Sequence, residues 1–92
     1  MYKIVFTNKM KKDVKRMKKR GKDITKLVYV LDMLAKKEIL PEKYRDHQLS
    51  NNLANYRECH MEPDWLLVYK YIDDILILTA TTTGTHSDIF GI

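Results

Sequence analysis

The chain has 92 residues, a length that allows one domain with a modest hydrophobic core. Its 45% hydrophobic and 32% charged residues are typical of a globular protein, and its apolar runs are far shorter than the ~20 residues that span a bilayer. The single cysteine, Cys59, excludes an internal disulfide framework, and the first residues lack the apolar stretch of a signal peptide. We therefore expect one cytoplasmic domain over residues 1–92, with no membrane contact.

The net charge of +5 is unevenly distributed along the chain. Residues 1–27 hold eleven lysines and arginines against two acidic residues, a local balance of +9, whereas residues 28–92 have a balance of −4. Such a one-sided field attracts polyanions, either a nucleic acid or an acidic protein. A solvated, lysine-rich helix face is the competing interpretation, and composition alone does not choose between them.

The first elements are predicted from alternation and capping signals. Residues 2–6 alternate and favour a strand, and Thr7 is a suitable N-cap for a helix running to about Arg20, with Gly21 just past its end. Asp23 is suited to cap a second helix that ends near Lys37. The apolar residues of this second helix follow the helical rhythm: Ile24, Leu27, Val28, Leu31, Leu34 and Ala35.

The second half of the chain predicts strands. Residues 41–52 are polar and irregular, and strand-like runs follow at 54–60, 65–71 and 75 to about 81, joined by short turns at 61–64 and 73–74. Short connections force neighbouring strands to be antiparallel. The second and third runs are nearly all apolar, as in central strands covered on both faces. The expected fold is α+β: one strand, two helices, then a three-stranded antiparallel meander that completes one sheet.

All three histidines, His47, His60 and His86, lie at predicted element ends or in loops. Each has acidic or hydroxyl neighbours, so a metal site and metal-free acid–base chemistry are both chemically possible. The spacings match no local metal-ligand motif, which favours acid–base chemistry. Taken singly, each histidine also has a structural explanation, as a residue that stabilises a loop, a strand end or the C-terminal turn.

Five sequence strings carry a resemblance to a known family. They are Lys12-Asp13-Val14-Lys15, Tyr44-Arg45-Asp46-His47, Tyr56-Arg57-Glu58-Cys59-His60, Glu62-Pro63-Asp64-Trp65-Leu66-Leu67-Val68-Tyr69 and Thr83-Gly84-Thr85-His86-Ser87-Asp88-Ile89-Phe90-Gly91. From the first strand to the last residue, the chain closely resembles the YafQ family. That family belongs to the RelE/ParE superfamily of bacterial type II toxin–antitoxin toxins, so the resemblance implies a RelE-like fold.

The resemblance also implies an activity. Such a toxin is an endoribonuclease that cleaves mRNA in the ribosomal A site, in contact with ribosomal RNA. It is neutralised by a cognate antitoxin, whose acidic segment would wrap the basic N-terminal third, and it reaches operator DNA only through the antitoxin complex. Cleavage in this superfamily uses the 2′-hydroxyl of the RNA as nucleophile, with no metal ion or other cofactor.

The site residues follow from the same resemblance, position by position. The catalytic set matches His47, His60, Asp64 and His86, with His86 as the expected acid and Asp64 or His60 as the base. The expected substrate-binding residues are Trp65, Phe90, Arg57 and Lys70. The expected surface for RNA, ribosome or antitoxin consists of Lys11, Lys12, Lys15, Arg16, Lys18, Lys19, Arg20 and Lys22.

The chain departs from the family at one position. Many members have an arginine immediately before the Thr-Gly-Thr-His block, where this chain has Thr82. The absence of this arginine has three possible interpretations. A lysine or Arg57 supplies the charge, a protonated histidine is sufficient, or the activity is reduced. The alternative function is therefore a catalytically weakened homologue that acts mainly as antitoxin-binding partner and co-repressor. A toxin with another target, such as gyrase, is the third hypothesis.

Overall fold

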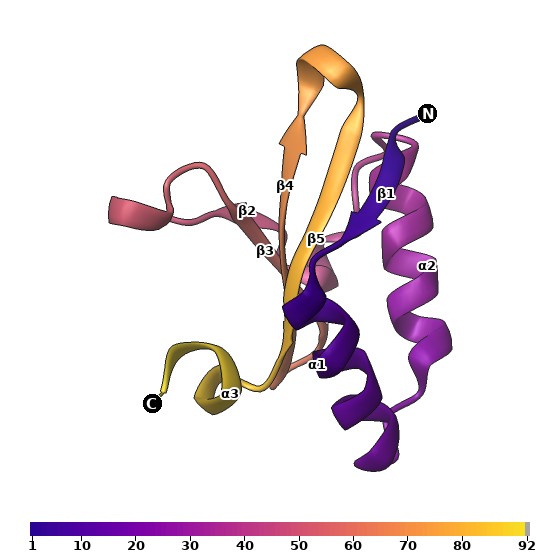
Figure 1. Ribbon diagram of the computed structural model, residues 1–92, viewed down its shortest axis with the longest axis vertical. Coiled ribbons are helices and arrows are strands. Elements are labelled where there is room, and N and C mark those ends of the chain that lie inside the picture. Colours follow the sequence, from indigo (N-terminus) through magenta and orange to yellow (C-terminus); the bar gives the residue numbers. More distant parts are fainter. Residues whose placement is uncertain (92) are drawn as a thin grey trace.

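The computed structural model describes residues 1–91, which form helices and the strands of one sheet (Figure 1). In chain order they are β1 (Lys3–Phe6), α1 (Asn8–Lys19), α2 (Ile24–Ala35), η1 (Glu42–Tyr44), β2 (His47–Gln48), η2 (Asn51–Leu53), β3 (Arg57–Glu62), β4 (Trp65–Ile72), η3 (Asp73–Ile75), β5 (Ile77–Gly84) and α3 (His86–Phe90). The η elements are single turns of 3₁₀ helix.

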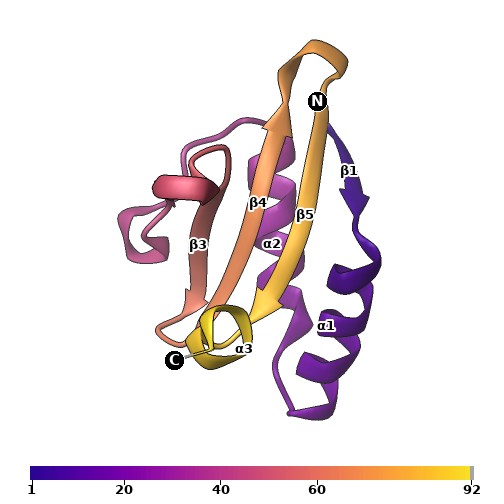
Figure 2. The same ribbon diagram turned by 60° about the vertical axis from the view of Figure 1, so that its left-hand side comes forward.

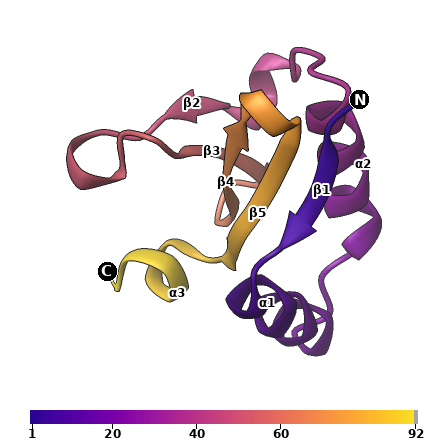
Figure 3. The same ribbon diagram turned by 45° about the horizontal axis from the view of Figure 1, so that its top comes forward.

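The five strands form one mixed sheet in the order β1-β5-β4-β3-β2. β1 runs parallel to β5, which the crossover through α1 and α2 permits, and every other pair is antiparallel. In Figures 2 and 3, α1 and α2 lie on one side of the sheet, while α3 and the η2 segment project on the other. The predicted α+β class is confirmed, and a short strand, β2, extends the expected sheet.

Both long helices begin at the residues that the capping signals indicated. The Thr7 hydroxyl accepts a hydrogen bond from the backbone N–H of Met10, and the Asp23 carboxylate accepts one from the backbone N–H of Thr25. Gly21 ends the first helical segment with a left-handed φ of 84°, which a residue without Cβ adopts freely. Local capping chemistry therefore fixes how α1 and α2 enter and leave the sheet.

The core lies between the two helices and one face of the sheet. Its buried members are Met10, Met17, Leu27, Val30, Leu31, Leu34, Ala35, Leu40, Cys59, Met61, Trp65, Leu67, Tyr69, Leu78 and Ala80. Because side chains alternate along a strand, the odd-numbered residues of β3 and of the buried part of β4 point into this core. The residues between them, such as Glu58, His60 and Val68, point to the opposite side, which α1 and α2 do not cover and which we call the open face, although Glu58 and Val68 are themselves buried by their neighbours.

The meander differs from its prediction at three places. β3 begins at Arg57 instead of residue 54 and runs to Glu62, and β5 spans Ile77–Gly84 instead of residues 75 to about 81. The turn before β5 is longer than expected because η3 forms and Leu76 takes a left-handed φ of 52°. Both faces are covered along most of β4, as expected, but the first part of β5 is only half covered.

Two short elements were not predicted. β2 interrupts the stretch expected to be irregular, and α3 follows β5 directly. Within residues 1–91 no helix is long and apolar enough to cross a membrane.

Candidate active site

The open face gathers the three histidines from distant parts of the chain. His47 on β2 pairs in register with Glu58 on β3, and His60 lies two residues further along the same strand and face. His86 reaches the face from the first turn of α3, which follows β5. The ring centroids of His60 and His86 lie 5.7 Å apart. The fold therefore brings the three imidazoles to one surface.

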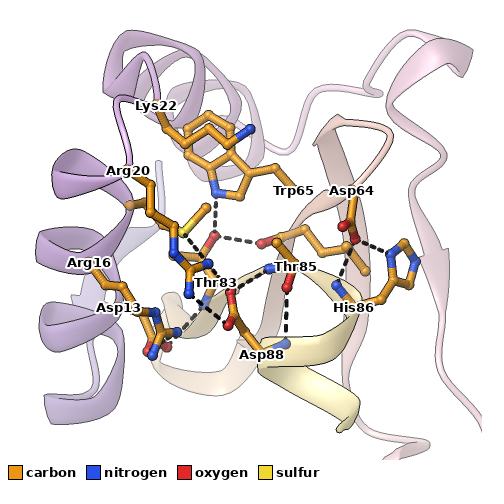
Figure 4. Close-up of polar contacts among 12 residues, drawn as sticks. Asp13, Arg16, Arg20, Lys22, Asp64, Trp65, Thr83, Thr85, His86 and Asp88 are labelled. Atoms are coloured by element: carbon orange, nitrogen blue, oxygen red, sulfur yellow. Dashed lines mark hydrogen bonds and ion pairs between the residues drawn. The ribbon is translucent and has the colours of Figure 1, made fainter. Parts of the chain in front are cut away.

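Asp64 and His86 form a bonded pair beside the first turn of α3 (Figure 4). The Asp64 carboxylate lies 2.6 Å from Nδ1 of the His86 ring and also accepts the backbone N–H of His86 at 2.8 Å. That backbone hydrogen bond, reinforced by the ring, lowers the pKa of the Asp64 carboxyl below its usual range. An ionised Asp64 fixes the proton on Nδ1 and leaves Nε2 as the reactive nitrogen.

Glu58 is a member of the site that sequence reasoning did not select. Its carboxylate is 6% exposed and lies between two histidines, with Oε1 at 3.2 Å from Nε2 of His47 and 3.4 Å from Nε2 of His60. Its other oxygen, Oε2, is buried without a hydrogen-bond partner among the described residues. The sequence does hold a signal for Glu58. Side chains two positions apart in a strand share a face, and Glu58 stands two positions before His60.

Hydrogen bonds of the ring Nδ1 atoms orient His47 and His60 toward Glu58. Nδ1 of His47 lies 2.8 Å from the carbonyl of Arg45, and Nδ1 of His60 lies 3.3 Å from the carbonyl of Pro63. A carbonyl oxygen only accepts, so each Nδ1 carries a hydrogen. Each Nε2 then faces Oε1 of Glu58, so two imidazoles and one carboxylate lie in contact on the open face. Imidazoles and carboxylates are the side chains that most often transfer protons in catalysis.

α3 is fastened to α1 by an ion pair that we call the clasp, formed by Arg20 and Asp88 (Figure 4). The guanidinium donates two hydrogen bonds to the carboxylate, at 2.5 and 3.1 Å. Asp88 also accepts the backbone N–H of Thr85, whose hydroxyl accepts the N–H of Asp88 in a capping box. The hydrogen bonds from Arg20 hold the pKa of the Asp88 carboxyl far below its usual range.

Gly84 permits this close packing. A Cβ at position 84 would meet the Cβ of Asp88 at 2.8 Å and its Oδ2 at 2.9 Å. The first turn of α3, which carries His86, is therefore positioned by the clasp, the capping box and the glycine together.

Thr82, the position where many relatives carry arginine, lies in register with Val68 and therefore on the open face. Its hydroxyl donates to the buried carboxylate of Asp13 at 2.5 Å. Asp13 is 2% exposed and also accepts from Lys9, Arg16 and the backbone N–H of Thr83. These hydrogen bonds connect α1 to the C-terminal end of β5.

Two expected substrate contacts lie elsewhere. Trp65 is fully buried on the core side, where its indole N–H donates to the Thr83 hydroxyl at 3.0 Å. Its ring is therefore inaccessible to a base, and its expected role as a direct substrate contact does not fit this placement. Arg57 points to the core side as well, because it alternates with Glu58, and it pairs with Asp46 at 3.3 Å.

The other two expected substrate contacts remain available. Lys70 shares the open face, two residues beyond Val68, and its ammonium lies 5.1 Å from the ring centroid of Tyr56. Phe90 ends α3 with a 38% exposed side chain. Both are placed where they can reach a ligand on the open face.

The eight basic residues expected to form a binding surface divide into two groups. In the first group, each residue forms an ion pair: Arg16 with Asp13, Arg20 with Asp88 and Lys22 with Glu62. The other five are exposed and form no ion pair within residues 1–91: Lys11, Lys12, Lys15, Lys18 and Lys19. These five lysines, all on α1, are the free part of the basic surface.

Within the described residues, no group of three or more histidine, cysteine or acidic side chains is arranged to hold a metal ion. Cys59, buried in the core, has a pKa raised by burial and takes no part in the open face.

Comparisons with known proteins agree with this geometry. Residues 2–91 match the family model described as "Bacterial toxin of type II toxin-antitoxin system, YafQ". The chain is 42% identical to the mRNA interferase toxin YafQ of Escherichia coli BL21-DE3 over 89 residues, 96% of this chain and 95% of that protein.

Solved structures give the same result. The E. coli DinJ-YafQ toxin-antitoxin complex contains a chain with a TM-score of 0.88 and 41% identity, covering 98% of each chain. A metal-bound toxin from Helicobacter pylori has a TM-score of 0.93 and 39% identity, covering 98% of this chain and 100% of that one.

Proposed function

Since this chain belongs to the YafQ family of bacterial type II toxins, we propose that it is an endoribonuclease that cleaves messenger RNA on the ribosome. The observation that supports this most strongly is the convergence of His60 and His86 on one open face, each next to a carboxylate. Two imidazoles at this separation can lie on opposite sides of one phosphodiester, which is the arrangement that acid–base cleavage of RNA requires.

The reaction begins at the 2′-hydroxyl of the RNA. A base in the Glu58–His60 pair takes the proton of this hydroxyl, and the 2′ oxygen forms a bond to phosphorus. The bond from phosphorus to the 5′ oxygen breaks, and His86 gives that oxygen a proton. The products are a 2′,3′-cyclic phosphate and a 5′-hydroxyl, and each positioned group typically contributes ~10²–10⁴-fold to the rate.

His86 suits the role of acid because Asp64 is ionised beside it. A carboxylate at 2.6 Å from Nδ1 stabilises the imidazolium and directs Nε2 toward the substrate. Asp64 is correspondingly a positioning residue in this proposal. The protonated His86 brings positive charge near the phosphate, which offsets part of what an arginine at position 82 would supply.

Partners follow the same reasoning. A relative is solved in the DinJ-YafQ toxin-antitoxin complex, and we infer that this chain likewise binds a cognate antitoxin with an acidic segment. The five free lysines of α1 provide a surface for that segment or for ribosomal RNA. Contact with operator DNA would then come through the antitoxin complex.

The second candidate function is that of a catalytically weakened toxin. It is favoured by Thr82, a neutral residue in register with Val68, where many family members carry arginine. In that case the protein would act mainly by binding its antitoxin and repressing transcription. The chemistry above needs no metal ion, so a metal like the one in the H. pylori toxin would not be required for cleavage.

The test is induction of the protein alone in bacteria, followed by primer extension on a reporter mRNA. We expect new 5′ ends inside translated codons with the unchanged protein and their loss in His86→Ala. Ser87→Ala is the matched control, since Ser87 is its exposed neighbour on α3. Growth arrest without new ends would contradict the proposal, and an absence of arrest would favour the weakened toxin.

A further inference from the structure

A pocket separate from the open face lies beside His60, at the edge of the sheet. It has a volume of about 580 Å³ and is bounded by α2, η1 and the turn between β3 and β4. β2 pairs only with Arg57 and Glu58, so the outer edge of β3 beyond Glu58 is free of strand partners. The volume lies within the range of pockets that hold small organic ligands.

The pocket adjoins the proposed site at His60, which lines the pocket and belongs to the site. The strands cross the open face in the order β5, β4, β3, and His86 follows β5 while His60 stands on β3. An RNA strand that crosses the sheet in this order with its scissile phosphate between the two imidazoles places its next nucleotide at the pocket.

The charge of the pocket wall suits a phosphate. Lys26, Lys43 and Arg45 line it, and its one acidic residue, Glu62, is already neutralised by ion pairs with Lys22 at 2.7 Å and Lys26 at 3.0 Å. Lys43 and Arg45 are exposed and form no ion pair within the described part of the chain. Two unpaired cations therefore remain for a polyanion.

Tyr44 gives the pocket a flat aromatic surface. Its ring is half-buried and packs against the core, while the Lys43 ammonium lies 5.3 Å from its centroid. Aromatic rings beside cations bind single-stranded RNA by stacking on the bases.

The backbone at Arg45 is strained, and this residue contacts both the pocket and the proposed site. Arg45 takes a left-handed conformation, with φ 49° and ψ 44°, which is costly for a residue with a Cβ. The same residue offers its carbonyl to Nδ1 of His47 at 2.8 Å. The conformation that fixes His47 thus also presents Lys43, Tyr44 and Arg45 around the pocket.

We propose that this pocket binds the nucleotide that neighbours the scissile phosphate, with its base on Tyr44 and its phosphate between Lys43 and Arg45. This subsite rests on the proposed ribonuclease function, whose substrate would cross it. It would contribute to the choice of cleavage position along the message.

Binding of an uncleavable probe tests the subsite without using cleavage. The probe is a fluorescein-labelled tetra-adenylate with 2′-O-methyl groups, which cannot attack its own phosphates, and the readout is fluorescence anisotropy. Tyr44→Leu keeps an apolar side chain but removes the ring, and we expect about tenfold weaker binding, within the range for loss of one stacked base. Tyr29→Leu is the matched control, because Tyr29 lies beside Tyr44 at a centroid distance of 6.0 Å but outside the pocket lining.

A second variant covers the case in which Tyr44→Leu unfolds, as thermal melting would reveal. Lys43→Gln should weaken binding several-fold, whereas Lys36→Gln, the same charge change at the end of α2, should not. Equal effects in each variant and its control, or no probe binding at all, would overturn the subsite. Binding as predicted by a protein that produces no cleaved mRNA would retain the RNA pocket and reject the ribonuclease function instead.

Discussion

At the scale of single residues, the buried carboxylate of Glu58 is better explained by a role in function than by a role in stability. A buried carboxylate with one unpartnered oxygen destabilises a fold unless protonated or fully paired. Glu58→Gln preserves the shape, removes the charge and leaves the strand intact. Activity and stability should therefore respond in opposite directions.

We expect Glu58→Gln to lower kcat for mRNA cleavage on programmed ribosomes by about 10²-fold, while its melting temperature stays equal or rises. Single-turnover kinetics and thermal melting of the same preparation measure both. A fall in melting temperature together with activity would mean that Glu58 serves the fold instead.

Position 82 tests where the charge at the phosphate comes from. Thr82 lies in register with Val68, but its side chain is buried and its hydroxyl is bonded to Asp13. In Thr82→Arg that hydrogen bond is lost, and the longer side chain extends past Asp13 over the face. We expect cleavage to rise by about tenfold, less than the ~10²–10³ that a single oxyanion donor contributes elsewhere, because the protonated His86 already supplies charge. Thr82→Gln, of similar length but neutral, is the control. A rate no higher than that of the unchanged protein would show that the charge is fully supplied elsewhere.

At the scale of elements, the clasp decides where α3 holds His86. Asp88→Asn keeps an acceptor for the backbone N–H of Thr85 but loses the ion pair with Arg20. We expect this variant and Arg20→Gln to lower kcat several-fold with KM unchanged, and the double variant to be no worse than either. Lys19→Gln, a free lysine one residue away, should leave kcat unchanged. If Arg20 acted only by binding RNA, Arg20→Gln would raise KM and Asp88→Asn would do nothing.

The clasp also predicts a pH dependence of stability. The pKa of Asp88 is lowered in the folded chain by hydrogen bonds from Arg20, so the ionised carboxyl stabilises the fold above its unfolded pKa of about 3.9. This stabilisation is lost as the pH falls from there through the lowered pKa. Urea unfolding should therefore show a difference between the unchanged protein and Asp88→Asn at pH 7 that shrinks below about pH 4. A difference that grows on acidification would contradict the assignment.

The elements also show how far sequence reasoning reaches. The starts of α1 and α2 follow from Thr7 and Asp23, since a cap is a local contact. α3 was missed because its five residues show no periodicity, although Thr85 and Asp88 have the spacing of a capping box. The convergence of the histidines came from the resemblance. Which face Trp65 and Arg57 occupy depends on strand register, which neither residue reveals by itself.

At the scale of the whole molecule, the largest group of unpaired basic side chains among residues 1–91 lies on one helix. The five unpaired lysines all belong to α1, and α1 lies beside the end of β5 from which α3 extends (Figure 1). The acidic excess of the second half is partly used in ion pairs to this region, through Glu62 and Asp88. An incoming polyanion would therefore be attracted to the side of the molecule where α1 meets the site.

Ribosome association should accordingly weaken with salt, with a slope of log K against log salt that reflects the number of phosphates contacted. Lys11→Gln/Lys15→Gln should reduce that slope by roughly 1–2, since each lost phosphate contact removes about 0.7–0.9. Lys36→Gln/Lys37→Gln, at the end of α2, is the matched control. Equal slopes for both double variants would remove the α1 lysines from the interface.

Cleavage by the proposed mechanism requires His86 to deliver a proton to the leaving 5′ oxygen. A substrate in which sulfur replaces that oxygen tests this most directly, because a thiolate leaves without protonation. On programmed ribosomes we expect His86→Ala to cleave the sulfur substrate at nearly the rate of the unchanged protein, while Glu58→Gln and His60→Ala remain slow. If His86→Ala stays as slow on sulfur as on oxygen, His86 is not the acid and the proposed arrangement of the site is wrong.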